Sequence, residues 1–324
     1  MKIALLTTPY SDFQVCTIVD GFLDLGHEVY DIEGPGRNYM EPWPVGRDID
    51  VDLFIMADTN NPPGLAIPTN VLGFSRGNNI PKVIIHGHDL WTDYISVPNS
   101  PKKPVPYDMS KCDIMFVRDL CSGDITETPY PVYPMEFSIE RRYMEACKNQ
   151  QIIDHRSYDV AFFGTPSTAR RSFLLDTLKS KFNCHFGDHV TFKEPDTYWS
   201  KWVNGRYVHA PKYYEALCNA KFALSPLGAG PSCGRTYEAY AAGCIPLIQK
   251  YPSDMEQIVD FIDGENCILW ETAEELVNKI KSYLGDSVHL TELQGRCYKF
   301  GTENLLSKHR AQFIIDKCKE HKLL

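Results

Sequence analysis

The distribution of apolar residues predicts alternating strands and helices along the whole chain. Residues 2–7 form a continuous apolar run, which is typical of a strand buried in a parallel sheet. The next apolar residues, Val15, Ile18 and Val19, recur at the spacing of an amphipathic helix, and Gly26 follows where a helix C-cap is expected. This alternation favours an α/β fold with helices on both faces of a parallel sheet.

The same alternation continues in two series. In the first half, further strands are expected at 28–32, 51–56, 82–86 and 114–117. A proline-rich connector at 130–134 and a polar helix at 140–151 then precede a second series. Its expected elements are strand 158–163, helix 170–179, strand 184–186, helix 212–220, strand 221–225, helix 235–242, strand 244–249 and helix 273–284.

The two series predict two Rossmann-like, doubly wound domains that face a central cleft. We expect an N-terminal domain at 1–150, a C-terminal domain at 151–306 and a final helix at 307–324. In doubly wound folds, ligands bind beyond the carboxyl ends of the strands. The loops that follow the strands are therefore where functional side chains are expected.

Charge is unevenly distributed. The chain has 33 basic and 42 acidic residues and a net charge of −9. Residues 1–150 hold 12 basic and 21 acidic side chains, whereas residues 151–324 hold 21 of each. An acidic first half disfavours binding to bare phosphate backbone without a local basic cleft. The final segment, 307–324, is basic and amphipathic, a pattern that can bind a membrane surface or pack against another domain. We expect it to pack back on the acidic N-terminal domain.

Cysteine usage and hydropathy indicate the cellular setting. Eleven cysteines are scattered without a CxxC pair, which predicts reduced, mostly buried thiols rather than disulfides or a zinc site. The first apolar run is too short for a signal peptide, and no stretch reaches the length of a membrane span. We expect a cytoplasmic protein without a membrane span, a monomer or a weak dimer.

Two common nucleotide-binding motifs are missing from the sequence. The loop at 7–12 has no GxGxxG, which disfavours a nicotinamide or flavin enzyme, and no GxxxxGK[ST] motif occurs in the chain. The loop after the strand at 158–163 instead offers Gly164, Thr165, Arg170 and Arg171 at the start of a helix. Backbone N–H groups, the helix dipole and arginine charge could together hold a diphosphate there.

The most informative segment is a glycine-rich loop that leads into a helix at 235–242. Arg235 and Glu238 are three residues apart and so share one helix face. Arginine suits phosphate, and a carboxylate suits a ribose diol as a double acceptor. In isolation the two residues would form only a weak intrahelical ion pair, but their loop context favours a binding role.

This segment resembles the donor-binding core of GT-B glycosyltransferases. Their C-terminal domains carry an Arg-x-x-Glu-Ala and Ala-Gly-x-x-Pro run, which corresponds here to 235–246. Residues 263–270 resemble a DGENG-type segment of the same enzymes, and 157–178 and 2–32 resemble the openings of their two domains. The order of the segments is similar to bacteriophage DNA β-glucosyltransferases and to spore-coat and exostosin-like glycosyltransferases. Retaining members often have a second glutamate where this chain has Gly230.

The resemblance implies a nucleotide-diphosphate sugar as donor, most often a UDP-sugar. Glu238 would bind the ribose. The remaining donor-site residues it implies are Gly164, Thr165, Arg170 or Arg171, Val208, Ser232, Arg235 and Tyr237. Asp89 would act as general base after the strand at 82–86, with His88 as the alternative. An aspartate pair such as Asp48 and Asp50 is the metal-binding motif of GT-A enzymes. Because this chain resembles GT-B enzymes instead, metal-independent donor binding is expected.

The resemblance implies a hexosyl- or pentosyltransferase, and several readings stay open. The acceptor is a hydroxyl on a modified DNA base, or on a glycan, lipid or protein of surface polysaccharide synthesis. A sugar-nucleotide epimerase and a sugar-nucleotide-binding protein without turnover are further alternatives. The segment order favours DNA, whereas the acidic first half favours the other acceptors.

Overall fold

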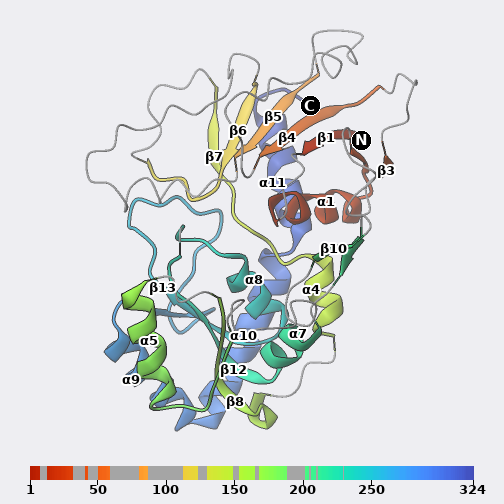
Figure 1. The fold of residues 1–324 in the computed structure, drawn as a ribbon. Coiled ribbons are helices and arrows are strands. Elements are labelled where there is room, and N and C mark those ends of the chain that lie inside the picture. The colour runs from red at the N-terminus through yellow and green to blue at the C-terminus, as the bar shows by residue number, and fades with distance from the viewer. Residues whose placement is uncertain are drawn as a thin grey trace.

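The computed structural model of the protein contains two parallel α/β units, drawn one above the other in Figure 1. The residues it describes are 1–7, 13–31, 41–42, 50–58, 80–86, 112–122, 130–148, 153–164, 168–187, 201–203, 206–208, 211–228 and 230–324. Among the helices of these residues, none has the length and apolarity needed to cross a membrane.

The first sheet is parallel throughout, in the order β3-β2-β1-β4-β5-β6-β7. Its strands are β1 (Lys2–Thr7), β2 (Glu28–Asp31), β3 (Glu41–Pro42), β4 (Leu53–Asp58), β5 (Lys82–His86), β6 (Ile114–Val117) and β7 (Val132–Pro134). Helix α1 (Phe13–Asp24) connects β1 to β2. The strand order reverses between β1 and β4, which is the topological switch point of this sheet.

The second sheet is also parallel, in the order β14-β13-β12-β8-β9. Its strands are β8 (Tyr158–Phe163), β9 (Cys184–Gly187), β12 (Ala220–Ser225), β13 (Ile245–Gln249) and β14 (Ile268–Trp270). The chain runs outward from β8 to β9 and returns to β12 on the other side. The switch point therefore lies between the carboxyl ends of β8 and β12, where a ligand site is expected.

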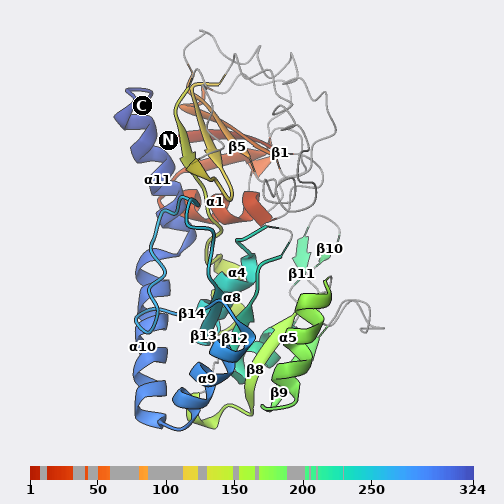
Figure 2. The same ribbon diagram turned by 90° about the vertical axis from the view of Figure 1, so that its left-hand side faces the viewer.

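Most of the remaining helices belong to the second unit, and the last two run along one side of both units (Figure 2). They are α4 (Arg141–Ala146), α5 (Ala169–Lys179), α7 (Pro211–Cys218), α8 (Gly234–Ala241), α9 (Ala273–Leu284), α10 (Ser287–Asn304) and α11 (Ser307–Glu320). Short elements are the 3₁₀ helix η3 (Ile153–His155) and the antiparallel pair β10 (Lys201–Val203) and β11 (Arg206–Val208). Figure 2 shows α10 beside the second unit and α11 beside the first.

The last helix packs on the first sheet's unit. Ile314, Ile315 and Cys318 of α11 share a buried apolar cluster with Ile18 and Phe22 of α1. A large aromatic and aliphatic cluster forms the core of the second unit. Because α11 follows α10 directly, the C-terminal segment connects the two units a second time.

The segment that connects the two units, within residues 130–148, differs from the sequence prediction in two places. Residues 130–134 were expected to be a connector, but Val132–Pro134 pairs with β6 as the edge strand β7. Proline has no backbone N–H to donate, and an edge strand needs fewer such donors because only one of its sides pairs with another strand. The polar helix expected at 140–151 is shorter, since α4 ends at Ala146. Most described cysteines are buried, and none of the described ones forms a disulfide.

The carboxyl ends of the two sheets meet through the segment after β6. Asp119 accepts a hydrogen bond from the Ser232 N–H in the loop after β12, at 3.1 Å. Ser122 N–H donates to the Asp254 carbonyl at 2.9 Å, and Glu256 N–H donates to the Leu120 carbonyl at 2.8 Å. The loops that follow the strands of both units therefore lie against each other here.

Candidate functional site

Arg235 lies at the switch point of the second sheet. Its Nε donates to the Phe163 carbonyl at the end of β8, at 2.7 Å. Its guanidinium carbon lies 4.7 Å from the centroid of the Phe162 ring. Burial lowers the pKa of Arg235, but the nearby Cys233, Tyr213 and Glu238 outweigh it and raise the pKa above its usual value. The first turn of α8 thus holds a fixed cation beside β8.

Gly164 allows this cation to lie against the chain. A Cβ atom at Gly164 would stand 2.6 Å from Arg235 Nη2 and 3.2 Å from Phe162 Cζ. Both distances are shorter than ordinary van der Waals contacts. A side chain at this position would displace the Arg235 guanidinium, so the glycine predicted from sequence lets that group approach the chain.

Arg171 brings a second cation to the same region. Thr168 caps α5 by accepting from the Arg171 N–H at 3.1 Å, and Arg171 Nη2 donates to the Leu227 carbonyl at 2.7 Å. Burial and the positive charge of Arg235 lower the pKa of Arg171. Its neighbour Arg170 is exposed. Two guanidinium groups that repel each other form a site that favours an anion.

Glu238 lies one helical turn after Arg235. It accepts hydrogen bonds from the hydroxyls of Tyr213 and Tyr214, which both belong to α7. Burial raises the pKa of Glu238 above its usual range, whereas Tyr213, Arg235 and other neighbours oppose that shift. Arg235 and Glu238 lie together as the sequence spacing predicts.

The glycine-rich loop between β12 and α8 is held at several points. Leu227 N–H donates to the Gln249 side chain at 3.1 Å, and Gly228 N–H donates to the Gly230 carbonyl at 3.0 Å. Ser232 is buried, and Asp119 of the first unit accepts from its N–H. The loop is therefore shaped by contacts from both units.

Tyr237 lies on a different face of α8 from Arg235 and Glu238. Its side chain is fully buried, and its hydroxyl donates to Glu136 at 3.4 Å. The structure therefore does not bring Tyr237 together with the other site residues. A position two residues after Arg235 points away from it on a helix, which accounts for the difference.

The remaining predicted site residues are placed only in part. Val208 ends β11, and its side chain is not described. Thr165, His88 and Asp89 lie outside the described residues. His86 ends β5, in register with Val117 of β6, so His88 and Asp89 follow a strand of the first sheet. In the described parts of the chain, no cluster of three or more His, Cys, Asp or Glu suits a metal ion.

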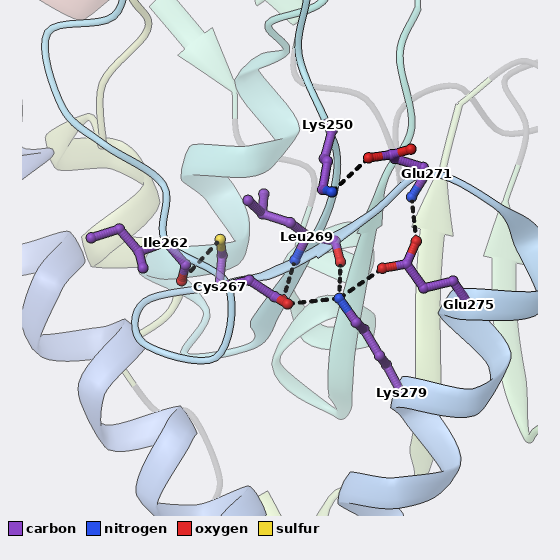
Figure 3. A network of polar contacts seen from close by, with 8 residues as sticks. Lys250, Ile262, Cys267, Leu269, Glu271, Glu275 and Lys279 are labelled. Carbon is purple, nitrogen blue, oxygen red and sulfur yellow. Dashed lines mark hydrogen bonds and ion pairs between the residues drawn. The ribbon is translucent and has the colours of Figure 1, made fainter. Parts of the chain in front are cut away.

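The DGENG-like segment, 263–270, contacts α8, the helix that carries Arg235 and Glu238. Lys279 donates to Asp263 Oδ2 and to the Leu269 carbonyl, both at 2.7 Å. It also pairs with Glu275 of the same helix, as Figure 3 shows. Gly264 takes a positive φ of 73°, which glycine adopts without strain. The carbonyl of Asn266 accepts from Tyr240 of α8 at 2.9 Å. In these contacts the segment fixes a turn and braces α8.

Sequence reasoning missed three side chains that shape the site. Tyr213 and Tyr214 hold Glu238, and Asp119 holds the glycine-rich loop. The adjacent tyrosines on a helix before a buried strand were a visible signal, since buried phenols need hydrogen-bond partners. Asp119 gave no comparable signal, because its partner is 113 positions away in the sequence.

Comparisons with known proteins agree with this arrangement. Residues 170–316 match the model of a family described as glycosyl transferase-like. No curated protein matches the chain. Several solved structures are similar over nearly their full length, at sequence identities so low that the likeness concerns the fold.

One similar structure is an alpha-glucosyltransferase in complex with UDP-glucose and DNA containing an abasic site. It is 12% identical, with 98% of this chain and 99% of that chain covered, at a TM-score of 0.61. Anabaena HepE in complex with UDP-glucose is 14% identical, with 99% and 100% covered, at 0.54. T4 phage BGT in complex with UDP and Mn²⁺ is 14% identical, with 99% and 100% covered, at 0.52.

The fold and the family match confirm the resemblance that the sequence motifs indicated. The matched region begins at α5 and ends within α11, so it includes Arg171, Arg235 and Glu238. The two parallel-sheet units of this chain match the fold of these structures over nearly their full length. The chain therefore has the GT-B fold, and its residues 170–316 resemble a glycosyl transferase-like family.

Proposed function

We propose that this protein transfers a hexosyl or pentosyl group from a UDP-sugar to an acceptor hydroxyl. The observation that carries the proposal is the placement of Arg235 and Glu238 on the first turns of α8, beside the end of β8. Arg235 would bind the diphosphate, and Glu238 would accept from the ribose hydroxyls. UDP complexes of proteins with the same fold support uridine as the nucleoside.

Arg171 is our choice over Arg170 for the second diphosphate contact. Its guanidinium is turned toward the glycine-rich loop and is close enough to Arg235 to be influenced by its charge. Gly164 lets Arg235 approach the backbone. Thr165, Val208 and Ser232, on neighbouring loops, would complete the donor site, and Tyr237 would support it from within the core.

Asp89 or His88 would take the proton from the acceptor hydroxyl. Both follow β5, and the carboxyl ends of the two sheets meet where Asp119 contacts Ser232. A base on this edge of the first sheet would face the donor site across the two units. Such a base is what an inverting transfer needs.

We further propose that the acceptor hydroxyl belongs to a modified base in DNA. The supporting observation is the full-length similarity to an alpha-glucosyltransferase whose complex contains DNA. The excess of acidic residues in 1–150 instead favours a glycan, lipid or protein acceptor. The acceptor arms of the experiment below decide between these classes.

Donor binding is proposed to need no metal ion. Arg171, Arg235 and the N-terminus of α8 would neutralise the charge that develops on the leaving diphosphate. The T4 phage BGT complex contains Mn²⁺, so a metal arm belongs in the test.

The test is a nucleotide-release assay over a panel of nucleotide sugars. It is run without acceptor, with hydroxymethylated DNA and with simple glycans, each in EDTA and in Mn²⁺. We expect release of UDP that depends on acceptor and persists in EDTA. Replacing Glu238→Gln or Arg235→Met removes charge-assisted hydrogen bonds and should lower kcat/KM about 10–100-fold. Arg171→Met should lower it more than Arg170→Met.

The outcomes separate the alternatives. Binding of UDP-sugar without turnover under any acceptor would favour a sugar-nucleotide-binding protein. Release stimulated by glycans and not by DNA would overturn the DNA acceptor and keep the transferase. Absence of binding and release with every donor would overturn the proposal as a whole.

Replacing Gly164→Ala should damage activity while the fold is retained. The added Cβ meets the end of the Arg235 side chain, which can move, so the melting temperature should change little. A guanidinium displaced by about an ångström should lower kcat/KM about 10-fold or more. In an Arg235→Met background the same alanine should have no further effect on kcat/KM. A Gly164→Ala enzyme with unchanged kcat/KM would contradict the assigned role of Arg235.

A further inference from the structure

Two neighbouring phenols hold the Glu238 carboxylate from one side. The Tyr213 hydroxyl donates to Oε2, and the Tyr214 hydroxyl donates to Oε1 at 3.4 Å. Each phenol therefore serves a different oxygen of the same carboxylate. Both side chains come from α7, which lies beside α4 (Figure 1) and reaches α8 through these two hydrogen bonds.

The phenols are themselves fixed by packing. Tyr213 is 8% exposed and Tyr214 is 2% exposed. Their rings lie edge to face, 4.9 Å apart, and Tyr213 also lies 4.8 Å from Phe163. Tyr214 packs against Tyr143 of α4 at 5.9 Å. Side chains held in this way present their hydroxyls at defined points at little further cost in entropy.

The arrangement leaves half of the carboxylate's acceptor capacity unused by these phenols. An ionised carboxylate has about four lone-pair positions, two on each oxygen. Tyr213 occupies one on Oε2 and Tyr214 one on Oε1. Each oxygen then has one position that the phenols do not fill, and two vicinal hydroxyls of a ribose could donate to these positions.

We propose that Tyr213 and Tyr214 are positioning residues that keep Glu238 ionised and oriented to accept the two ribose hydroxyls of the donor nucleotide. The inference rests on the proposed function, because it requires Glu238 to contact the ribose. It assigns the tyrosines an effect on nucleotide affinity that acts through Glu238 rather than by contact with the nucleotide.

The electrostatic surroundings agree with this role. Burial raises the pKa of both phenols well above the usual value, and the charge of Glu238 adds to the rise, so they remain protonated donors. Besides the phenols, the titratable or charged groups of the described residues that influence Glu238 are Arg235 on α8, Arg142 on α4 and Cys147 at the end of α4. The two arginines and the phenols oppose the burial that raises the Glu238 pKa.

Removing a phenol should therefore change how nucleotide affinity depends on pH. Without the Tyr213 hydroxyl the pKa of Glu238 rises further, and the ionised form is lost at a higher pH. Affinity for UDP weakens as the pH falls through this pKa. In Tyr213→Phe the weakening should begin about one pH unit higher than in the unmodified protein, because one hydrogen bond to a charged group is lost.

The experiment measures the Kd of UDP by calorimetry between pH 5 and pH 9. The variants are Tyr213→Phe, Tyr214→Phe, Glu238→Gln and each phenylalanine combined with Glu238→Gln. The matched control is Tyr133→Phe, since that tyrosine belongs to β7 of the first unit and its hydroxyl lies 2.7 Å from His321 Nε2, not beside Glu238. We expect the single phenylalanine variants to weaken UDP binding at pH 6 about 10-fold. Tyr133→Phe should bind UDP as the unmodified protein does at every pH.

The combined variants separate positioning from general damage. With Gln at position 238 nothing titrates there, so the phenylalanines should add little to the Kd and should not change its pH dependence. Equal pH profiles for Tyr213→Phe, Tyr214→Phe and the unmodified protein would overturn the inference while Glu238→Gln still weakens binding. If Glu238→Gln binds UDP normally, the ribose contact of the proposed function is wrong, and the inference falls with it. If a phenylalanine variant is too unstable to titrate, the other single variant decides.

Discussion

Replacing Arg310→Met should destabilise the protein by about 3–5 kcal/mol, because it leaves a buried carboxylate without its cation. Arg310 is 1% exposed, and its Nη2 lies 2.9 Å from Glu136 Oε2. It also donates to the Phe137 carbonyl at 3.2 Å and to the Asn304 carbonyl at 3.4 Å. Urea unfolding at pH 8, followed by fluorescence, measures the loss.

The second variant in this test replaces both partners. In Glu136→Gln/Arg310→Met no charge remains buried, while the glutamine oxygen can still accept from the Ile258 N–H, which now donates to Glu136 at 2.8 Å. The double variant should recover at least half of the lost stability. A loss below about 1 kcal/mol in Arg310→Met would show that the ion pair contributes little.

The pH dependence of the same variant has a defined sign. Burial raises the pKa of Glu136, and Arg310 is the strongest influence that lowers it. Without Arg310 the folded protein binds a proton at Glu136 more readily than the unfolded chain does, so stability rises as the pH falls. The deficit of Arg310→Met should therefore be largest at high pH and shrink as Glu136 becomes protonated.

Glu136 links three parts of the fold through polar contacts. It joins the segment between the two units, the final helix α11 and, through Tyr237, the helix that carries Arg235 and Glu238. Tyr237 was predicted to bind the donor, yet its hydroxyl reaches this ion pair instead. A motif read along the sequence includes residues on every face of a helix, and only the fold decides which face meets the ligand.

The strands were the most predictable part of the fold. Strands such as Lys82–His86 and Tyr158–Phe163 were predicted to the residue, because strands buried on both faces are continuously apolar. The edge strand Val132–Pro134 was missed, because Pro131 and Pro134 are residues that disfavour a strand. Strand order was beyond the sequence, because it depends on crossovers between distant segments.

The site shows the same division. The placement of Arg235 and Glu238 on one helix face was predictable, because helical spacing alone puts them there. Their role in donor binding stays a prediction. The phenols that hold Glu238 and the Asp119 contact to Ser232 depend on tertiary packing, which no local pattern records. The boundaries of the two domains near residue 150 and the choice of Asp89 or His88 as base stay predictions.

Replacing Gly21→Ala should destabilise the protein by about 3 kcal/mol, near the upper end of the cost of overpacking a core. Gly21 lies where α1 crosses the start of α11. A Cβ atom there would lie 2.1 Å from the Ser307 carbonyl oxygen and 2.4 Å from its carbonyl carbon. These are backbone atoms, so no side-chain rotation relieves the clash, and α11 must move away from α1.

That movement would break contacts that fix the entry of α11. Ser307 N–H donates to the Ile139 carbonyl at 3.1 Å, and the Ser307 and Ser138 hydroxyls are 2.9 Å apart. Helix propensity acts in the opposite direction, because alanine favours a helix over glycine by about 1 kcal/mol. The matched control is Gly295→Ala in α10, where an added Cβ would have no neighbour within 4 Å. Thermal unfolding should show Gly295→Ala melting slightly higher than the unmodified protein and Gly21→Ala several degrees lower. Equal melting of the two variants would mean that α1 and α11 do not approach as closely as the contact at Ser307 requires.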